Sequence, residues 1–270
     1  MLRSFVLLLA FVCLGLLAAT IISCGGSGSG GKNCTGGPYN VAGNWEITVN
    51  SNGVGSVSGW GAIDPSGLAV FFDATGDTVE TPTITGACYF SGNMTAYAEP
   101  GSVPAGGTTV VTDPAQGNVN SSTAIKGTFT GQSPNPSGTF SLTSFSPLSG
   151  SATAFTGAMT GVSKDLAAAV LLEVTFAQSG SGSSMSFSST NLSSCAVTGT
   201  FTQAGTSNVF DVAVNFTGSG PGCPASGTVT GIGFESSTDY LSLSNGASGP
   251  YLYADLVQLS SSAFVIEFHQ

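Results

Sequence analysis

Charged residues, and basic ones above all, are scarce in this 270-residue chain. Four Lys and Arg residues stand against fourteen Asp and Glu, and charged residues make up 7% of the sequence, whereas globular proteins average about 25%. An acidic chain of this kind repels phosphate backbones, so we expect no nucleic-acid binding. Ser, Thr, Asn and Gly must solvate the surface instead, which favours a folded body with an uncharged polar exterior.

Histidine is also nearly absent, and this limits the chemistry available. The single histidine is His269, one residue from the end of the sequence, and we expect it to be an exposed residue at the end of a strand. A Ser-His-Asp triad needs an imidazole held rigidly by its neighbours, and catalytic zinc needs His or Cys ligands. The sequence therefore predicts no metal or other cofactor and favours a protein that is not an enzyme.

A long apolar run occurs only at the N-terminus. A short basic head ending at Arg3 precedes uninterrupted apolar residues from Ser4 to Ile22, which is typical of a secretory signal. The run approaches the roughly 20 residues needed to span a bilayer, so a transmembrane anchor is the alternative. The residues that follow, Ile21-Ile22-Ser23-Cys24, resemble the lipobox of bacterial lipoproteins.

That resemblance implies removal of residues 1–23 as a signal peptide and acylation of Cys24. Gly25, rather than Asp, follows the cysteine, which in that family implies an outer-membrane location, either periplasmic or surface-exposed. Several acyl chains together give a stable anchor, whereas one chain does not. Residues 24–39 would then form the lipidated cysteine and a flexible linker, because Gly and Ser dominate it from Gly25 to Gly31 and such sequences behave as random coils.

Four cysteines would remain beside the lipidated one, namely Cys34, Cys88, Cys195 and Cys223. An even number in an oxidising compartment predicts disulfides. Three connectivities are possible, and we favour Cys34–Cys88 and Cys195–Cys223 because each pair falls within one of the two units described below. No Cys-x-x-Cys spacing supports a metal site.

Strict alternation of apolar and polar residues dominates from Gly43 onward. It is clearest over residues 170–177, 210–217 and 264–269, and it predicts antiparallel strands with one apolar face. Gly, Pro, Asn and Ser separate these strands at short intervals, as hairpins require. One brief helix is expected, near Ser163 to Ala168. The fold class is therefore all-β, an antiparallel meander forming a barrel or a sandwich.

Three segments recur in the same order along the chain. Residues 45–49 resemble 172–176, residues 88–95 resemble 195–202, and residues 127–131 resemble 227–231. Such self-similarity predicts two similar repeat units, which we place at 40–170 and 171–270. The sequence leaves open whether they form two barrels or two halves of one.

Two tripeptides carry a resemblance to the lipocalins. Gly43-Asn44-Trp45 is similar to the Gly-x-Trp signature that opens a lipocalin barrel, and Thr238-Asp239-Tyr240 is similar to a second lipocalin signature. The resemblance implies an eight-stranded cup that holds a small apolar ligand.

Acidic residues provide the remaining candidates for chemistry. Glu235 and Asp239 are the best carboxylate pair for glycoside hydrolysis, which needs two acids about 5–10 Å apart. Tyr240, Tyr251 and Tyr253 follow in the sequence and could stack on a sugar ring. The acidic stretch 73–80 has oxygen ligands for Ca²⁺ but lacks the EF-hand spacing, so an ordinary acidic turn is the expectation.

Together these features predict a lipid-anchored envelope protein with a binding or surface-structural role. Its partner would be a protein, a glycan or a small apolar ligand, and its lipid would hold it to the membrane. A lipocalin-like carrier and a carboxylate-dependent glycosidase are the alternatives.

Overall fold

The computed structural model describes residues 37–53, 55–97, 110–131, 136–145, 157–165, 168–178, 184–189, 195–205, 208–218, 227–242, 250–258 and 262–269. All regular secondary structure in these ranges is β-strand, which confirms the predicted all-β class. The predicted signal peptide, Cys24, Cys34 and Cys223 lie outside the described residues. Within the described ranges, no helix is long and apolar enough to cross a membrane.

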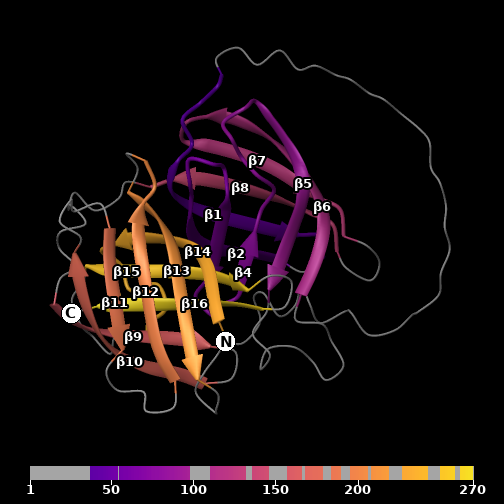
Figure 1. Ribbon diagram of the computed structural model, residues 1–270. Coiled ribbons are helices and arrows are strands. Elements are labelled where there is room, and N and C mark those ends of the chain that lie inside the picture. The colour runs from indigo at the N-terminus through magenta and orange to yellow at the C-terminus, as the bar shows by residue number, and fades with distance from the viewer. Residues whose placement is uncertain are drawn as a thin grey trace.

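The first eight strands form a closed antiparallel barrel, barrel 1 (Figure 1). Each strand pairs with the next in the chain, and β1 pairs with β8 to close the ring. The strands are β1 (Gly43–Ser51), β2 (Gly55–Ile63), β3 (Ala69–Asp73), β4 (Thr78–Glu80), β5 (Tyr89–Tyr97), β6 (Val110–Ser121), β7 (Ala124–Phe129) and β8 (Gly138–Ser144).

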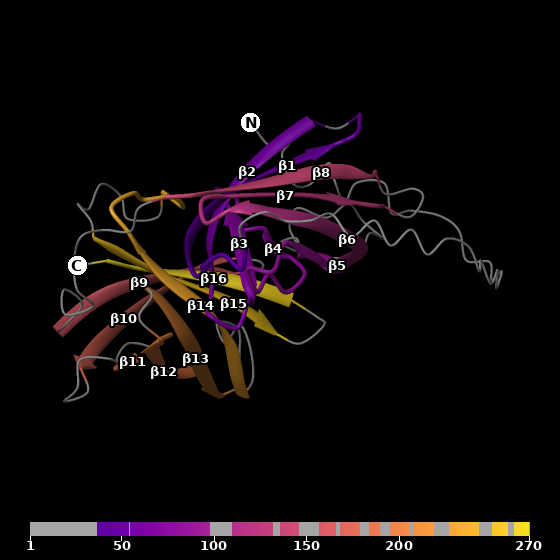
Figure 2. The same ribbon diagram turned by 90° about the horizontal axis from the view of Figure 1, so that it is seen from above.

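The last eight strands form a second closed barrel, barrel 2, which lies beside the first (Figure 2). This ring closes where β9 pairs with both β10 and β16. The strands are β9 (Gly157–Asp165), β10 (Ala168–Gln178), β11 (Ser184–Ser189), β12 (Cys195–Gln203), β13 (Val209–Gly218), β14 (Gly227–Ser236), β15 (Tyr251–Gln258) and β16 (Ser262–His269). Closure removes the exposed strand edges that a lysine-poor chain could not protect by charge.

Two details of the sequence-based fold differ from the structure. The helix predicted near Ser163 to Ala168 is wrong: β9 runs to Asp165 and β10 begins at Ala168, with these two residues paired in register. Pairing of β9 with strands on both sides overrides the local preference for helix. The barrels divide the strands between β8 and β9, so β9 closes barrel 2 although it falls within the range 40–170 assigned to the first unit.

The three matched segments do not occupy equivalent strands. In barrel 1 they lie on β1, β5 and β7, whereas in barrel 2 they lie on β10, β12 and β14. Two eight-stranded units are present, but the segment-by-segment repeat stays a prediction.

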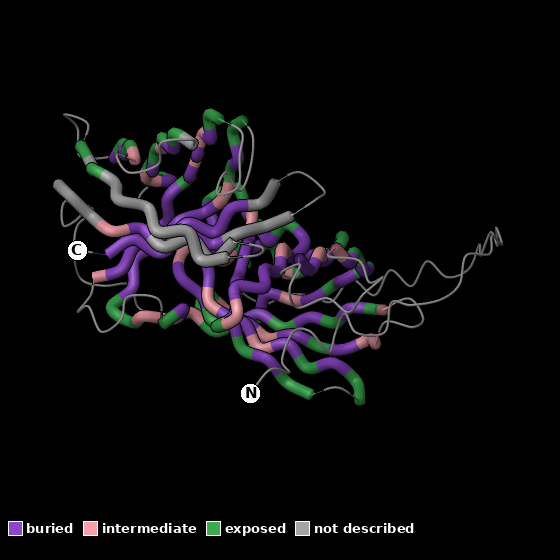
Figure 3. Tube along the Cα trace, turned by 90° about the horizontal axis from the view of Figure 1, so that it is seen from below, coloured by how far each residue is buried: buried purple, intermediate pink, exposed green. Residues whose placement is uncertain are grey.

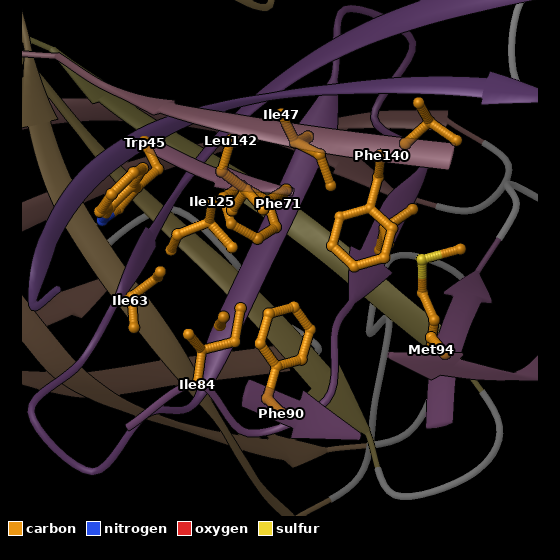
Figure 4. Packing of buried hydrophobic residues seen from close by; sticks show 14 of the residues in the cluster. Trp45, Ile47, Ile63, Phe71, Ile84, Phe90, Met94, Ile125, Phe140 and Leu142 are labelled. Atoms are coloured by element: carbon orange, nitrogen blue, oxygen red, sulfur yellow. The ribbon is translucent and has the colours of Figure 1, made fainter. Parts of the chain in front are cut away.

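Side chains fill the interior of barrel 1. Ile47, Phe71, Phe90 and Phe140 are among the buried apolar residues that converge on its centre (Figure 4). The inward positions alternate with exposed polar ones along strands such as β6 and β7, as expected for a barrel with one solvated face. Barrel 2 is filled in the same way by buried apolar residues, among them Phe187, Phe201 and Phe268.

Candidate functional site: the seam between the barrels

The two barrels share a contact surface, here called the seam. Strands β2, β3 and β4 of barrel 1 lie against β14, β15 and β16 of barrel 2. Buried segments gather where the barrels meet, while buried and exposed residues alternate along strands farther away (Figure 3). The seam is therefore a third core, outside both barrels.

Aromatic side chains form the apolar part of the seam. Phe72 of β3 lies 5.8 Å from Phe234 of β14 and 5.2 Å from Tyr253 of β15, measured between ring centroids. Its neighbour Phe71 points the other way, into the core of barrel 1. Strand β3 is thus buried on both faces, which explains why Ala69-Val70-Phe71-Phe72 is an unbroken apolar run rather than an alternating one.

A buried hydroxyl group, that of Tyr253, lies at the centre of the polar part of the seam. Its oxygen accepts a hydrogen bond from the Tyr240 backbone N–H at 2.8 Å, and lies 2.8 Å from the Thr238 carbonyl oxygen and 2.9 Å from Glu267 Oε2. A phenol has one hydrogen to donate, and the carbonyl can only accept. The hydrogen of the Tyr253 hydroxyl is therefore within reach of two acceptors, the Thr238 carbonyl and Glu267 Oε2.

Asp239 and His269 complete this cluster around Glu267. Burial raises the pKa of Glu267 to about 7, and the charge of Asp239 and a hydrogen bond to it add to the rise, while hydrogen bonds from Tyr253 and the Leu241 backbone oppose it. Burial also lowers the pKa of His269. His269 Nδ1 and Glu267 Oε1 are 3.8 Å apart, but burial disfavours the charged form of both, which weakens any ion pair between them.

Two further acids are buried in barrel 2. Burial alone raises the pKa of Glu235 to about 7. Asp255 accepts a hydrogen bond from the Thr78 hydroxyl across the seam at 3.0 Å. Burial raises its pKa to about 8, an effect that the Thr78 bond opposes and Glu80 reinforces.

The predicted site residues are only partly brought together. Asp239, Tyr240 and Tyr253 meet at the seam, and Tyr251 lies 6.5 Å from Tyr253 between ring centroids. Glu235 pairs in register with Leu252, whose side chain lies in the core of barrel 2. The sheet therefore separates it from the cluster of Asp239 and Glu267, and the pairing of Glu235 with Asp239 has no geometric support.

The expectation for His269 is wrong. It is 7% exposed, because Tyr251, with 6.4 Å between the ring centroids, and the neighbouring Glu267 and Asp239 surround it. Sequence reasoning also missed Glu267 and Asp255. Both occupy polar positions of alternating strands and look like surface residues until a second barrel covers them.

A cavity of about 590 Å³ opens at the edge of the seam. Asn44 and Trp45 at the start of β1, Ser144 at the end of β8 and Phe145 just beyond it form one side. The part of its lining that belongs to barrel 2 is formed by Gly205 and Asn208, from the connection between β12 and β13. The lipocalin-like Gly43-Asn44-Trp45 thus lies at a cavity between the barrels, while the barrel interior is filled with side chains.

The other candidates have structural explanations among the described residues. Asp73 Oδ1 accepts hydrogen bonds from the Thr75 backbone, the Thr75 hydroxyl and the Asp77 backbone, so the acidic stretch forms a turn closed on itself. No cluster of three or more potential metal ligands occurs within the described ranges. Cys88 is disulfide-bonded, and the proposed pairings with Cys34 and between Cys195 and Cys223 stay predictions.

Comparisons with known proteins add little. No protein-family model matches the chain, and no curated protein matches it. A search of solved structures finds intact Ap-TbpB with its N and C lobes, at 11% sequence identity and a TM-score of 0.29, covering 86% of this chain and 77% of that one. A similarity this low carries no functional argument.

Proposed function

We propose that this protein is a lipid-anchored envelope protein whose two-barrel body is a binding module without enzymatic activity. The anchor rests on the lipobox-like Ile21-Ile22-Ser23-Cys24 at the end of an apolar run, followed by a Gly/Ser linker. We assign it to the outer membrane because Gly25, rather than Asp, follows Cys24. The proposal leaves both faces of that membrane open. Because the body is strongly acidic, the lipid, rather than the protein surface, would hold it to the membrane.

The observation that supports a binding role is the cavity at the seam. The interiors of both barrels are occupied by large apolar side chains, so an apolar ligand inside a barrel, as in a lipocalin, is not favoured. The carboxyl cluster around Glu267 does not line the cavity. The open space and the ionisable groups are therefore in different places, which favours binding over catalysis.

The anchor is tested by the intact mass of the protein from a bacterial membrane fraction, measured with and without reduction. Loss of residues 1–23, an added lipid mass on Cys24 and a gain of two hydrogens for each of two disulfides are the expected results. A Cys24→Ala variant should stay uncleaved and without lipid, whereas a Cys13→Ala variant, altered inside the apolar run, should be processed normally. Normal lipidation of Cys24→Ala, or an unlipidated wild-type protein that keeps its N-terminus, would contradict the proposal.

A further inference from the structure

The seam cavity has the size and position of a ligand site. Ligand pockets are typically about 300–1,000 Å³ and occur preferentially where domains meet, and this cavity measures about 590 Å³. Both barrels contribute to its wall, since Pro65 of barrel 1 and Gly205 and Asn208 of barrel 2 line it together.

The lining of the cavity is polar but uncharged. Three asparagines (Asn40, Asn44 and Asn208) and two serines (Ser122 and Ser144) line it, and none of the described lining residues carries a charge. An ionic ligand would lose its hydration here without gaining a partner of opposite charge, which is costly. A neutral ligand rich in hydroxyl groups matches these amides and hydroxyls, each of which can donate or accept.

Asn44 provides an independent sign of an absent hydrogen-bond partner. Its side chain is 2% exposed and its Nδ2 donates to the Glu235 carbonyl oxygen at 3.3 Å, while its Oδ1 is buried and has no hydrogen-bond partner. Leaving a buried polar atom without a partner is unfavourable. Asn44 lines the cavity but its Oδ1 is fully covered, so a hydroxyl group bound there can supply the missing hydrogen once the amide side chain turns toward the cavity.

Phe145 connects the lining of the cavity to a group of half-buried aromatic rings that pack against the seam. Phe145 lines the cavity and meets Tyr240 edge to face, with 6.4 Å between their centroids. Tyr240 stacks on Trp60 at 4.3 Å, and all three rings are half-buried. Of these rings only Phe145 lines the cavity, and its half-buried ring offers an apolar surface on which the C–H side of a sugar ring can pack.

The geometry points to the seam cavity as a binding site for a neutral oligosaccharide, held by Asn44, Asn208 and the serine hydroxyls, with Phe145 packing against its rings. This inference rests on the proposed binding role and names the class of ligand. It requires both barrels, because the β12–β13 connection forms part of the wall.

The test uses the full mature protein, solubilised in detergent, and a panel of neutral hexasaccharides: cellohexaose, maltohexaose and chitohexaose. Oligogalacturonate of the same length serves as a charged counterpart. Calorimetry gives the affinity, and tryptophan fluorescence gives a local signal because Trp45 lines the cavity and Trp60 lies at its aromatic edge. We expect at least one neutral hexasaccharide to bind and the charged one to bind more weakly.

The variants Asn44→Ala and Asn208→Ala test the location of the site. Each should weaken binding about tenfold, the loss of one hydrogen bond of about 1.4 kcal/mol, whereas Asn93→Ala on the exposed face of β5 should leave it unchanged. Asn208 is half-buried in a connection between strands, so its variant tests the site even if Asn44→Ala disturbs folding.

Three results would overturn the inference: no neutral hexasaccharide binding at millimolar concentration, equal affinity for the charged hexasaccharide, or binding that neither cavity variant weakens. These outcomes are distinct from failure of the anchor. A protein that lacks the lipid yet binds a neutral hexasaccharide through Asn208 would overturn only the anchor.

Discussion

The hydroxyl of Tyr253 lies 2.9 Å from Glu267 Oε2, and both groups are buried where barrel 1 covers barrel 2. That hydroxyl also forms hydrogen bonds with the Tyr240 backbone N–H and the Thr238 carbonyl, so it connects β15 and β16 to the segment that follows β14. One phenol therefore holds together the part of barrel 2 that faces its neighbour.

Removing this hydroxyl should destabilise the protein. Tyr253→Phe leaves the Tyr240 N–H, the Thr238 carbonyl and the Glu267 carboxyl without their shared partner, and a buried group left unpaired costs about 1–3 kcal/mol. We expect a loss of that order in the free energy of unfolding, measured by urea denaturation. Tyr89 bonds Gln116 but is 54% exposed, so Tyr89→Phe should cost much less, and equal losses in the two variants would contradict this role for Tyr253.

Stability should fall as the pH rises through neutrality. Glu235, Glu267 and Asp255 have folded-state pKa values raised to about 7, 7 and 8, so above the pKa of the unfolded carboxyls, about 4, the folded state binds more protons than the unfolded state. Unfolding then becomes easier with increasing pH, by at most about 1.4 kcal/mol per pH unit for each group. The fall should end slightly above pH 8, where these groups are ionised in both states.

The lowered pKa of His269 acts in the opposite direction, but only up to about pH 6.5, where unfolded histidine loses its proton. A comparison of the wild-type protein with a variant that keeps His269 but lacks the three carboxyl groups cancels this contribution between pH 6.5 and 8.5. The triple variant Glu235→Gln, Glu267→Gln, Asp255→Asn should flatten the slope in this window, and Glu46→Gln on the exposed face of β1 should retain it. A slope unchanged in the triple variant would show that other groups titrate.

The hydrogen bond from Thr78 to Asp255 should contribute to holding the barrels together. Thr78→Val keeps the shape of the side chain but leaves Asp255 Oδ1 buried without its donor, which should cost about 1–3 kcal/mol. Hydrogen exchange should rise at the backbone amides of β4 and β15 before it rises elsewhere. Thr128→Val, on the exposed face of β7, is the matched control and should change neither quantity.

A close approach of strands at Gly61 should make that position intolerant of any side chain. A Cβ atom added there would collide with the backbone of Val70 and Phe71 on β3. Strand β3 contributes side chains both to the core of barrel 1 and to the seam. Gly61→Ala should therefore lower the free energy of unfolding by several kcal/mol or prevent folding. Ser58→Ala, an exposed change on the same strand, should fold normally; a Gly61→Ala protein of wild-type stability would contradict the packing described for β2 and β3.

The sequence by itself determined the class of fold, because alternation with period two is a local property of each strand. Strands such as β10, β13 and β16 could be recognised from residues 170–177, 210–217 and 264–269, and three recurring segments predicted two units. The proposed lipid on Cys24 also depends only on adjacent residues. Where the local signal was weak, as between β9 and β10, a helix was predicted in error.

Only the tertiary structure decided which polar residues are buried. Glu267 and His269 alternate with the core residues Ile266 and Phe268, so their pattern is that of a solvated face. Tyr253 and Asp239 nevertheless bury that face, and Asp255 is covered by Thr78, 177 positions away in barrel 1, which no local signal encodes. The same holds for the cavity, since Asn44 and Asn208 belong to different barrels and become neighbours only because the barrels pack side by side. Long-range packing, rather than sequence pattern, thus raised the pKa values of the buried carboxyl groups. It also placed uncharged polar side chains around the seam cavity.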